Sequence, residues 1–248
     1  MDDKPRTPRH RSEGGYARGD ETRRRIIDAA IRLFGERGFE GASTREIARA
    51  AGVNAPALQY YFEGKEGVYR ACAQHIAESA AAHFGPALRH AQTLLDDPDT
   101  PQAALAEAFD VFLDALADHL LVAEDAQHRR LFMAHEQVGH GPSVLFEQMN
   151  QILRPHLGQI GAQLVARLTG LPERDPLTAI RVMTLIGQVM VFHTNQRSFV
   201  TKMGWERLGE EHVALIKSTV RAQSRVLMAS WRTDAPGSSA SPSVSGPA

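Results

Sequence analysis

Hydrophobic residues recur every three to four positions along most of this 248-residue chain. That spacing is typical of amphipathic α-helices, and long runs of β-branched residues, which favour strands, are rare. We therefore predict an all-α protein. The expected helices cover residues 22–38, 65–95 with a break or kink at Gly85-Pro86, 102–122, 124–137, 143–169 with an interruption at Pro155, 175–200 and 205–232.

Two short helices joined by a tight turn are predicted within residues 43–65. Ser43 followed by Glu46 is a capping box, which satisfies free N–H groups at a helix start. Gly52 can adopt the left-handed conformation that ends a helix. Asn54 is a good N-cap, and Pro56 stands in the first turn of the next helix, where its missing N–H is harmless. This arrangement is typical of a helix-turn-helix.

The second helix of this pair carries the candidate DNA contacts. At about 100° per residue, Leu58 and Phe62 share one face and Gln59 lies roughly opposite. The first face would pack on the preceding helices, and the second would enter the major groove. Gln59 could pair with adenine, while Pro56 and Ala57 could contact a thymine methyl group. The DNA-binding candidates are Thr44, Arg45, Asn54, Ala55, Pro56, Ala57, Gln59, Tyr60, Tyr61 and Lys65. Several would contact phosphates. For Tyr61, a core position is favoured over a DNA contact.

Three segments resemble the N-terminal domain of TetR/AcrR-type regulators: Thr-Arg-Glu-Ile-Ala at 44–48, Ala-Gly-Val at 51–53, and Tyr-Tyr-Phe-Glu-Gly-Lys-Glu-Gly-Val-Tyr at 60–69. The resemblance covers about residues 21 to 70. It implies a three-helix DNA-binding domain and, in most members, a repressor. The family usually has a Tyr at the position of Gln59, so the contacts with bases are expected to differ here.

The charge of the chain is divided unevenly. The whole chain has 28 Lys and Arg against 29 Asp and Glu, a net charge of −1. Residues 1–70 nevertheless have a net charge of +3, and the remainder has −4. The positive excess lies with the proposed DNA-binding helices, as binding to phosphates requires.

Four segments are predicted from these patterns. Residues 1–19 would be a disordered basic arm, 20–66 the helix-turn-helix domain, 67–232 a helical domain for ligand binding and dimerisation, and 233–248 a disordered tail. The arm could lie in a minor groove, although a solvated tail is the simpler interpretation.

The C-terminal part resembles the ligand domain of CecR-type members of the family. The resemblance lies in residues 130–137, 168–170, 185–188 and 203–205. It implies a small-molecule effector, of unknown identity, bound inside a helical bundle. For each candidate for its pocket, a place in the ordinary core is the favoured alternative. The candidates are mostly aromatic: Phe109, Phe112, Phe132, Met133, Phe146, Met149, Phe192 and His193.

The last two predicted helices carry apolar stripes that could form a homodimer through a four-helix bundle. The stripes could also pack only within the subunit. A dimer is favoured because two linked DNA-binding domains bind a palindromic operator more tightly than one. The interface candidates are Ile180, Met183, Gly187, Met190, Val213, Ile216 and Val220.

Other functions find little support in the sequence. His135 and His140 are five residues apart instead of the four that a zinc-protease helix needs. We expect no catalytic residues, metal or cofactor, and a single cysteine, Cys72, excludes an intrachain disulfide. No segment is expected to have the length and apolarity of a membrane span, so a soluble cytoplasmic protein is predicted. The alternatives are a DNA-binding regulator without a small-molecule ligand and, less favoured, an enzyme or metal-binding bundle.

Overall fold

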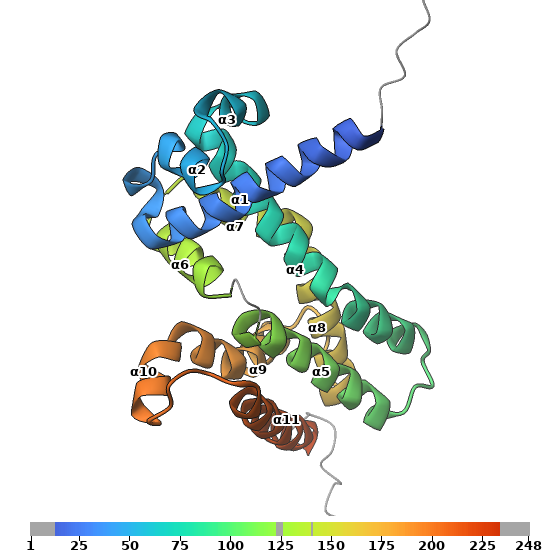
Figure 1. The fold of residues 1–248 in the computed structure, drawn as a ribbon. Coiled ribbons are helices and arrows are strands. Elements are labelled where there is room, and N and C mark those ends of the chain that lie inside the picture. Colours follow the sequence, from blue (N-terminus) through green and yellow to red (C-terminus); the bar gives the residue numbers. More distant parts are fainter. Residues whose placement is uncertain (1–12, 123–125, 140, 234–248) are drawn as a thin grey trace, which may run out of the picture. The chain divides into compact units, whose positions relative to one another are not determined.

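The computed structural model describes residues 13–122, 126–139 and 141–233, and every element in these ranges is helical (Figure 1). The predicted all-α fold is confirmed. The chain divides into two compact units. The first unit comprises the residues up to Ile76 together with Leu131–Phe146, and the second comprises Ala77–Arg130 and the residues from Glu147 onward.

The first unit contains α1 (Glu13–Gly41), α2 (Thr44–Ala50), α3 (Ala55–Tyr61) and the first part of α4 (Gly64–Asp96). One face of α1 is buried, with Ile26 and Phe34 almost completely inaccessible. The backbone of α1 kinks at Gly38, whose φ is 73°. That left-handed conformation suits glycine, and it turns the chain toward α2.

An aromatic cluster completes the core of the first unit. The ring of Phe132, from α6 (Ala126–Gln137), stacks on Tyr69 of α4 with a centroid distance of 4.5 Å, and Phe34 meets both rings edge-on. The carboxylate of Glu136 accepts hydrogen bonds from the backbone N–H groups of Leu145 (2.9 Å) and Phe146 (3.1 Å). These bonds satisfy free donors at the start of α7 (Val144–Ile152). The second half of α6 is thus an integral part of the unit that carries α1 to α3.

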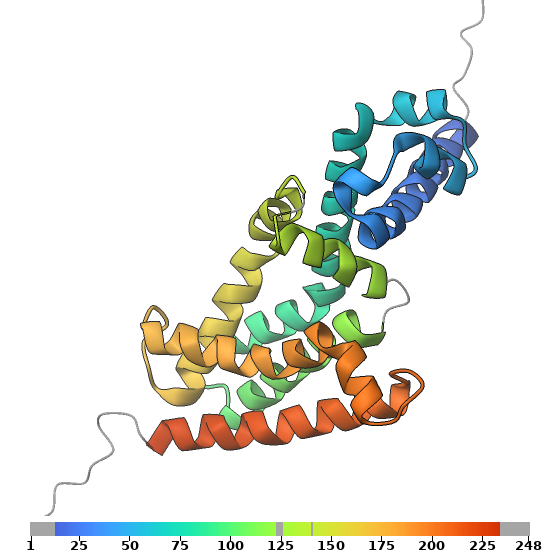
Figure 2. The same ribbon diagram turned by 90° about the vertical axis from the view of Figure 1, so that its left-hand side faces the viewer.

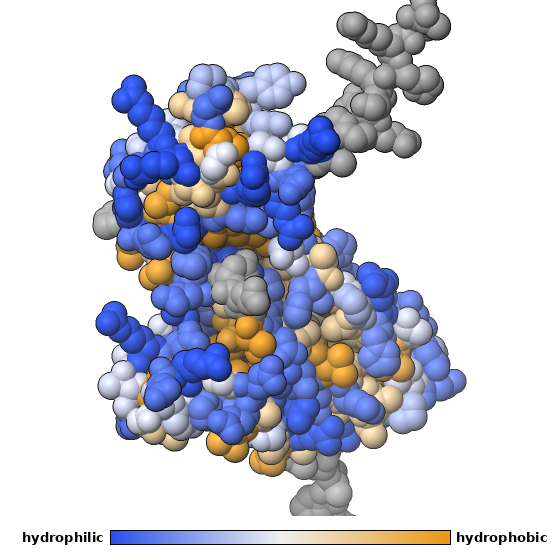
Figure 3. All heavy atoms as spheres, viewed as in Figure 1, coloured by the Kyte–Doolittle hydropathy of each residue, from blue (hydrophilic) through white to orange (hydrophobic). Residues whose placement is uncertain are grey.

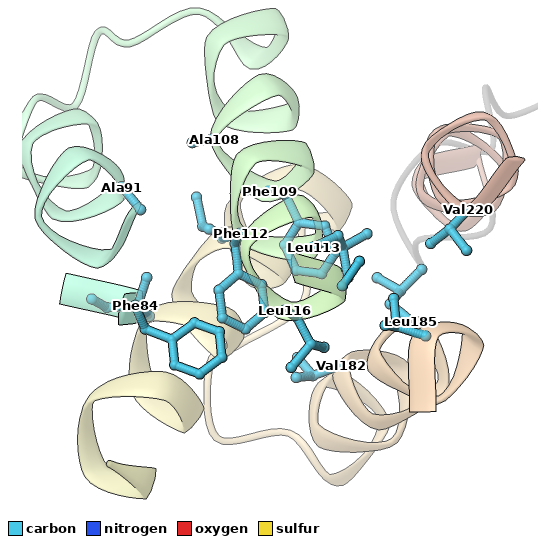
Figure 4. Packing of buried hydrophobic residues seen from close by; sticks show 14 of the residues in the cluster. Phe84, Ala91, Ala108, Phe109, Phe112, Leu113, Leu116, Val182, Leu185 and Val220 are labelled. Carbon is cyan, nitrogen blue, oxygen red and sulfur yellow. The ribbon is translucent and has the colours of Figure 1, made fainter. Parts of the chain in front are cut away.

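The second unit is built around α5 (Gln102–Ala117), which packs against α8, α9 and α11. Figure 4 shows Phe109 and Phe112 of α5 converging with Phe84 of α4, Leu185 of α9 and Val220 of α11. All five side chains are buried. Figure 2 shows the remaining helices of this unit, which are α8 (Arg154–Thr169), α9 (Pro176–Thr194), α10 (Gln196–Lys202) and α11 (Glu210–Thr233).

A π-helical turn, η1 (Asp118–Val122), continues α5. A π-helical turn disturbs the regular backbone hydrogen bonding, and basic side chains supply hydrogen bonds to carbonyls in this region. His83 Nε2 lies 2.9 Å from the carbonyl oxygen of Ala115, Arg129 donates to that of His119 (2.9 Å), and His193 Nδ1 lies 3.1 Å from that of Leu120. The sequence did not predict this turn, because the groups that accommodate it come from three other helices.

Three ion pairs join α5 to α11. Asp118 pairs with Lys217 (2.6 Å), Asp114 with Arg221 (2.6 Å) and Asp110 with Arg225 (2.5 Å). The partners recur every four residues on both helices, so the pairs form a ladder along the contact. Asp110 is the most buried of the six side chains, and burial raises the pKa of its carboxyl group.

Two predictions about helix boundaries can be compared with the structure. Of the break or kink expected at Gly85-Pro86, the break is absent, because α4 is one helix with Pro86 inside it. Part of the predicted disordered arm, residues 13–19, is helical and opens α1. The rest of the arm, and the tail from residue 234 onward, lie outside the described residues.

One helix also overturns the expectation that no segment matches a membrane span. Among the described residues, α9 alone is long and apolar enough by length and composition, with a mean hydropathy of 1.3. A core helix of a soluble protein passes the same test, and one face of α9 does lie in the core, through Val182, Leu185 and Val189. The opposite face exposes Ile180 and Met183.

Candidate nucleic-acid interface

Local hydrogen bonds shape the two short helices as their sequence predicts. The Ser43 side chain accepts from the Glu46 N–H (3.3 Å), and the Glu46 carboxylate accepts from the Ser43 N–H (3.1 Å), so the capping box is complete. The Asn54 side chain accepts from the Ala57 N–H (2.8 Å) at the start of α3. Gly52 has a φ of 67° in the turn between them. Each of these residues does what its position in the pattern requires.

Glu46 also holds α2 onto α1. Its carboxylate pairs with Arg37 of α1 at 2.7 Å. Hydrogen bonds from Ser43, followed by the hydrogen bond and charge of Arg37, lower the pKa of this carboxyl group. Arg37 was not singled out from the sequence, because no local spacing relates it to Glu46.

The faces of α3 follow the predicted division. Leu58 and Phe62 are buried beneath the helix, while Gln59 is exposed and Tyr60 has 84% of its surface exposed. Tyr61 is partly buried, and its hydroxyl lies near the backbone of Gly19. A tyrosine exposed so fully, on a capped helix anchored by Leu58, is available for contacts outside the chain.

The other candidate DNA contacts differ in their solvent exposure and in their contacts within the unit. Arg45 is exposed at the start of α2, and Asn54, Ala55 and Pro56 are exposed at the start of α3, whereas Thr44 and Ala57 are partly buried. Lys65 is engaged within its own unit. Its ammonium donates to the carbonyl of Glu40 (3.3 Å) and lies 4.5 Å from the centre of the Phe39 ring.

The eight candidate effector residues do not form one group. Phe132, Met133 and Phe146 belong to the first unit, where Phe132 is part of the aromatic cluster and Phe146 is 55% exposed. Phe109 and Phe112 are filled core of the second unit. The remaining candidates are Met149, Phe192 and His193, which also belong to the second unit. Helical spacing identified apolar faces correctly, but it could not tell which of the two units each face joins.

The candidate dimer residues also divide. Ile180 and Met183 of α9 are 60% and 68% exposed, and Gly187 and Met190 are partly buried. On α11, the predicted place of Val213, Ile216 and Val220 in the dimer interface needs correction. All three are buried in the core of their own unit. The exposed apolar residues of α11 are Leu215 and Val226 instead. Figure 3 shows hydrophobic residues reaching the surface in patches among hydrophilic ones.

Two protein families account for most of the chain. Residues 26–72 match the family described as bacterial regulatory proteins of the tetR family. Residues 105–230 match the C-terminal domain of the HTH-type transcriptional dual regulator CecR. The chain is 33% identical over 207 residues to the HTH-type transcriptional dual regulator CecR of Shigella flexneri, a match that covers 82% of this chain and 89% of the relative.

Solved structures share the fold at lower identity. AibR, in a complex with isovaleryl coenzyme A and operator DNA, superposes with a TM-score of 0.58 at 15% identity, over 82% of this chain and 97% of that one. FadR from Bacillus subtilis, in a complex with stearoyl-CoA, gives 0.53 at 16% identity, over 81% and 96%. The exposed face of a capped α3 and the two family matches agree: the chain belongs to the TetR family of DNA-binding transcription regulators, which are not enzymes, and carries a CecR-type C-terminal domain.

Proposed function

We propose that this protein is a homodimeric repressor that leaves a palindromic operator when a small molecule binds its second unit. The observation that carries the DNA-binding part is the division of α3 into a buried face, with Leu58 and Phe62, and an exposed face, with Gln59 and Tyr60. A helix N-terminus of this kind places its first turns against base edges in the major groove. Binding to chromosomal DNA would place the protein in the cytoplasm.

Each candidate DNA contact has a distinct role in this proposal. The amide of Gln59 pairs with a base, since Gln can bond adenine N6 and N7 together. Pro56 and Ala57 touch a thymine methyl group. Arg45 and Tyr60 contact phosphates, with Thr44, Asn54 and Ala55 beside them, and so fix the position of the helix on the DNA. Lys65 contributes less, because its ammonium is already held by the Glu40 carbonyl and the Phe39 ring.

A second copy of the chain covers the exposed face of α9. Ile180, Met183 and Val191 are each at least half exposed and recur at helical spacing, and Leu215 and Val226 are exposed on α11. Exposed apolar residues that share one face of a helix are typical of interfaces. Met183→Glu should therefore yield monomers in sedimentation, whereas Ser198→Glu, on the exposed side of α10, should leave the dimer intact. A dimer that persists in Met183→Glu would contradict this interface.

An effector would act by preferring one of two conformations. The structures of AibR and FadR hold acyl-coenzyme A molecules, which shows that the fold can accommodate such ligands. In this chain, α4 and α6 each contribute residues to both units, so a shift of either helix would alter the spacing of the two α3 helices of the dimer. Half-sites about 34–36 Å apart would then no longer be matched.

The test is a mobility shift on the DNA upstream of the gene, with random DNA as competitor and a salt series. We expect salt-sensitive, specific binding of two chains per site. Arg45→Ala should weaken binding to specific and random DNA alike, and Arg89→Ala, a basic residue of the second unit, serves as the control. Transcription from the same fragment then distinguishes repression from activation. Equal affinity for operator and random DNA would contradict the proposal.

A further inference from the structure

Arg130 of α6 is a partly buried cation with one hydrogen-bond acceptor among the described residues. A guanidinium has five N–H donors and favours two parallel bonds to a carboxylate or phosphate. Here its hydrogen-bond acceptor is the neutral side-chain oxygen of Gln196, at the start of α10. Among the described residues, Arg130 forms no ion pair. Its other N–H donors have no acceptor among the described residues.

Several other arginines of the second unit have more favourable acceptors. Arg225, whose side chain is 58% exposed, pairs with Asp110, and Arg221, which is partly buried, pairs with Asp114. Arg167 donates to the backbone carbonyls at the end of α4 and beyond, including that of Asp97 (2.9 Å). Unlike these residues, Arg130 has neither an anionic acceptor nor several acceptors in the described ranges, and such acceptors usually offset the cost of burying a charge.

The surroundings of Arg130 favour an anion. Burial lowers the pKa of its guanidinium, and no acidic residue in the described part of the chain offsets this effect. His193 is buried beside it, and burial, followed by the charges of Arg130 and Arg129, lowers the pKa of the imidazole. A neutral His193 donates from Nδ1 to the Leu120 carbonyl. The positive charge in this part of the unit therefore lies on the arginines.

Aromatic side chains stand next to these polar groups. Phe192 precedes His193 on α9, and Phe199 lies one turn beyond Gln196 on α10. Their rings meet edge-on at a centroid distance of 5.0 Å, and both are partly buried against the core. If the charged end of a ligand contacted Arg130, the rest of the ligand could pack against the rings of Phe192 and Phe199.

We propose that Arg130 binds the anionic head group, a carboxylate or a phosphate, of an amphipathic effector. The anion replaces the Gln196 amide as the acceptor for the guanidinium, and Phe192 and Phe199 contact the apolar part. This inference rests on the proposed function, since it names the chemistry that the effector presents to the second unit.

The position of Arg130 also suggests how binding is communicated. Arg130 is the last residue of its segment in the second unit, and Phe132, two residues later on α6, stacks on Tyr69 in the first unit. Release of Gln196 removes the hydrogen bond between α6 and α10. An anion at Arg130 thus acts on the helix whose next turn forms part of the core beneath the DNA-binding helices.

The experiment compares octanoate, octyl phosphate and octanol, which share an eight-carbon chain and differ in the head group. Their dissociation constants are measured by calorimetry on the full-length protein. We expect one or both anions to bind the wild type roughly ten- to a hundredfold more tightly than octanol, the range for hydrogen bonds to charged groups. The carboxylate and phosphate arms identify which head group the site prefers.

Variants assign the preference to Arg130. Arg130→Gln should reduce the ratio between anion and octanol to about one, while Arg130→Lys should retain part of it because the charge remains. Arg197→Gln, at the exposed residue next to Gln196, is the matched control and should keep the wild-type ratio. Circular dichroism and operator binding without ligand verify that each variant is folded, and Arg130→Lys tests the site should Arg130→Gln fail to fold.

Two results would overturn the inference: equal affinity of the wild type for the anions and octanol, or an anion preference that survives in Arg130→Gln. Operator binding, measured on the same preparations, separates this outcome from failure of the proposed function. Specific operator binding without anion preference would contradict only the role of Arg130. Arg130-dependent anion binding without specific operator binding would contradict the proposed function instead.

Discussion

The two compact units of this protein satisfy their polar groups over very different distances along the chain. In the first unit, the helix-turn-helix relies on hydrogen bonds between residues three positions apart, such as Ser43 with Glu46 and Asn54 with Ala57. In the second, the ion pairs between α5 and α11 join residues 99 to 115 positions apart. The shape of α2 and α3 is therefore fixed locally, whereas the second unit depends on the correct docking of distant helices.

The aromatic cluster is the exception to the local character of the first unit, and it gives the largest expected effect. Phe132→Ala removes a fully buried ring that contacts Phe34 and Tyr69. The free energy of unfolding should fall by about 3–5 kcal/mol, as for other buried Phe side chains. Urea denaturation measures this change, and Phe146→Ala, at a residue that is 55% exposed, is the control. A loss below about 1 kcal/mol would show that Phe132 is not core.

The second-largest effect is expected from the ion pairs between α5 and α11. Asp110→Ala removes a buried carboxylate that accepts hydrogen bonds from Arg225, so the free energy of unfolding should fall by about 1.5–3 kcal/mol. Asp118→Ala removes the partner of Lys217 at a side chain that is 42% exposed, and should cost less than about 1 kcal/mol. Urea denaturation measures both losses. Equal losses for the two variants would show that the contribution of an ion pair does not depend on how deeply its carboxylate is buried.

A smaller loss is expected from the capping box. Ser43→Ala deletes the side chain that accepts from the Glu46 N–H at the start of α2. Loss of an N-cap costs about 1 kcal/mol, and Ser43→Gly should cost less because glycine is itself a fair N-cap. Thermal denaturation of the two variants tests this order. If both melt like the wild type, the cap does not stabilise the unit.

The smallest effects concern pH, and they have opposite signs in the two units. The pKa of Glu46 is lowered in the folded state, so its contribution is present above the ordinary Glu pKa of about 4.3 and is lost as the pH falls through the lower folded value. The pKa of Asp110 is raised, so the folded state holds that proton more tightly. Asp110 therefore makes stability fall as the pH rises from about 3.9 through the higher folded value.

Denaturation between pH 3 and 7 can separate the two contributions. Relative to the wild type, Glu46→Gln should lose the stability that grows as the pH rises to the ordinary Glu value and stays constant above it, whereas Asp110→Asn should lose the opposing dependence. The slope of the free energy of unfolding against pH should change in opposite directions for the two variants. A change in the same direction would contradict the directions of the two pKa shifts.

The same contrast explains what could be predicted from sequence. The caps at Ser43 and Asn54, the turn at Gly52 and the two faces of α3 follow from residues within one or two turns, and the structure confirms them. The π-helical turn after α5 and the role of Arg130 could not be predicted, because their partners, such as His83, His193 and Gln196, lie far away along the chain.

Apolar stripes posed a different difficulty. The stripe of Val213, Ile216 and Val220 was recognised correctly as one helical face, but periodicity does not show whether a face meets its own core or a second copy. Phe132 likewise has the spacing of a core residue. It packs in the core of the first unit, although α6 begins in the second unit. Only the three-dimensional packing decides between such alternatives.

The central claim is that the exposed face of α3 recognises specific bases, and a base-by-base scan of the operator tests it most directly. Each base pair of the bound fragment is replaced in turn, and affinities are compared for the wild type and Gln59→Ala. We predict that the wild type loses about 1–3 kcal/mol at one adenine–thymine pair in each half-site, and that Gln59→Ala no longer distinguishes that pair. A scan that is identical for the two proteins would contradict the claim.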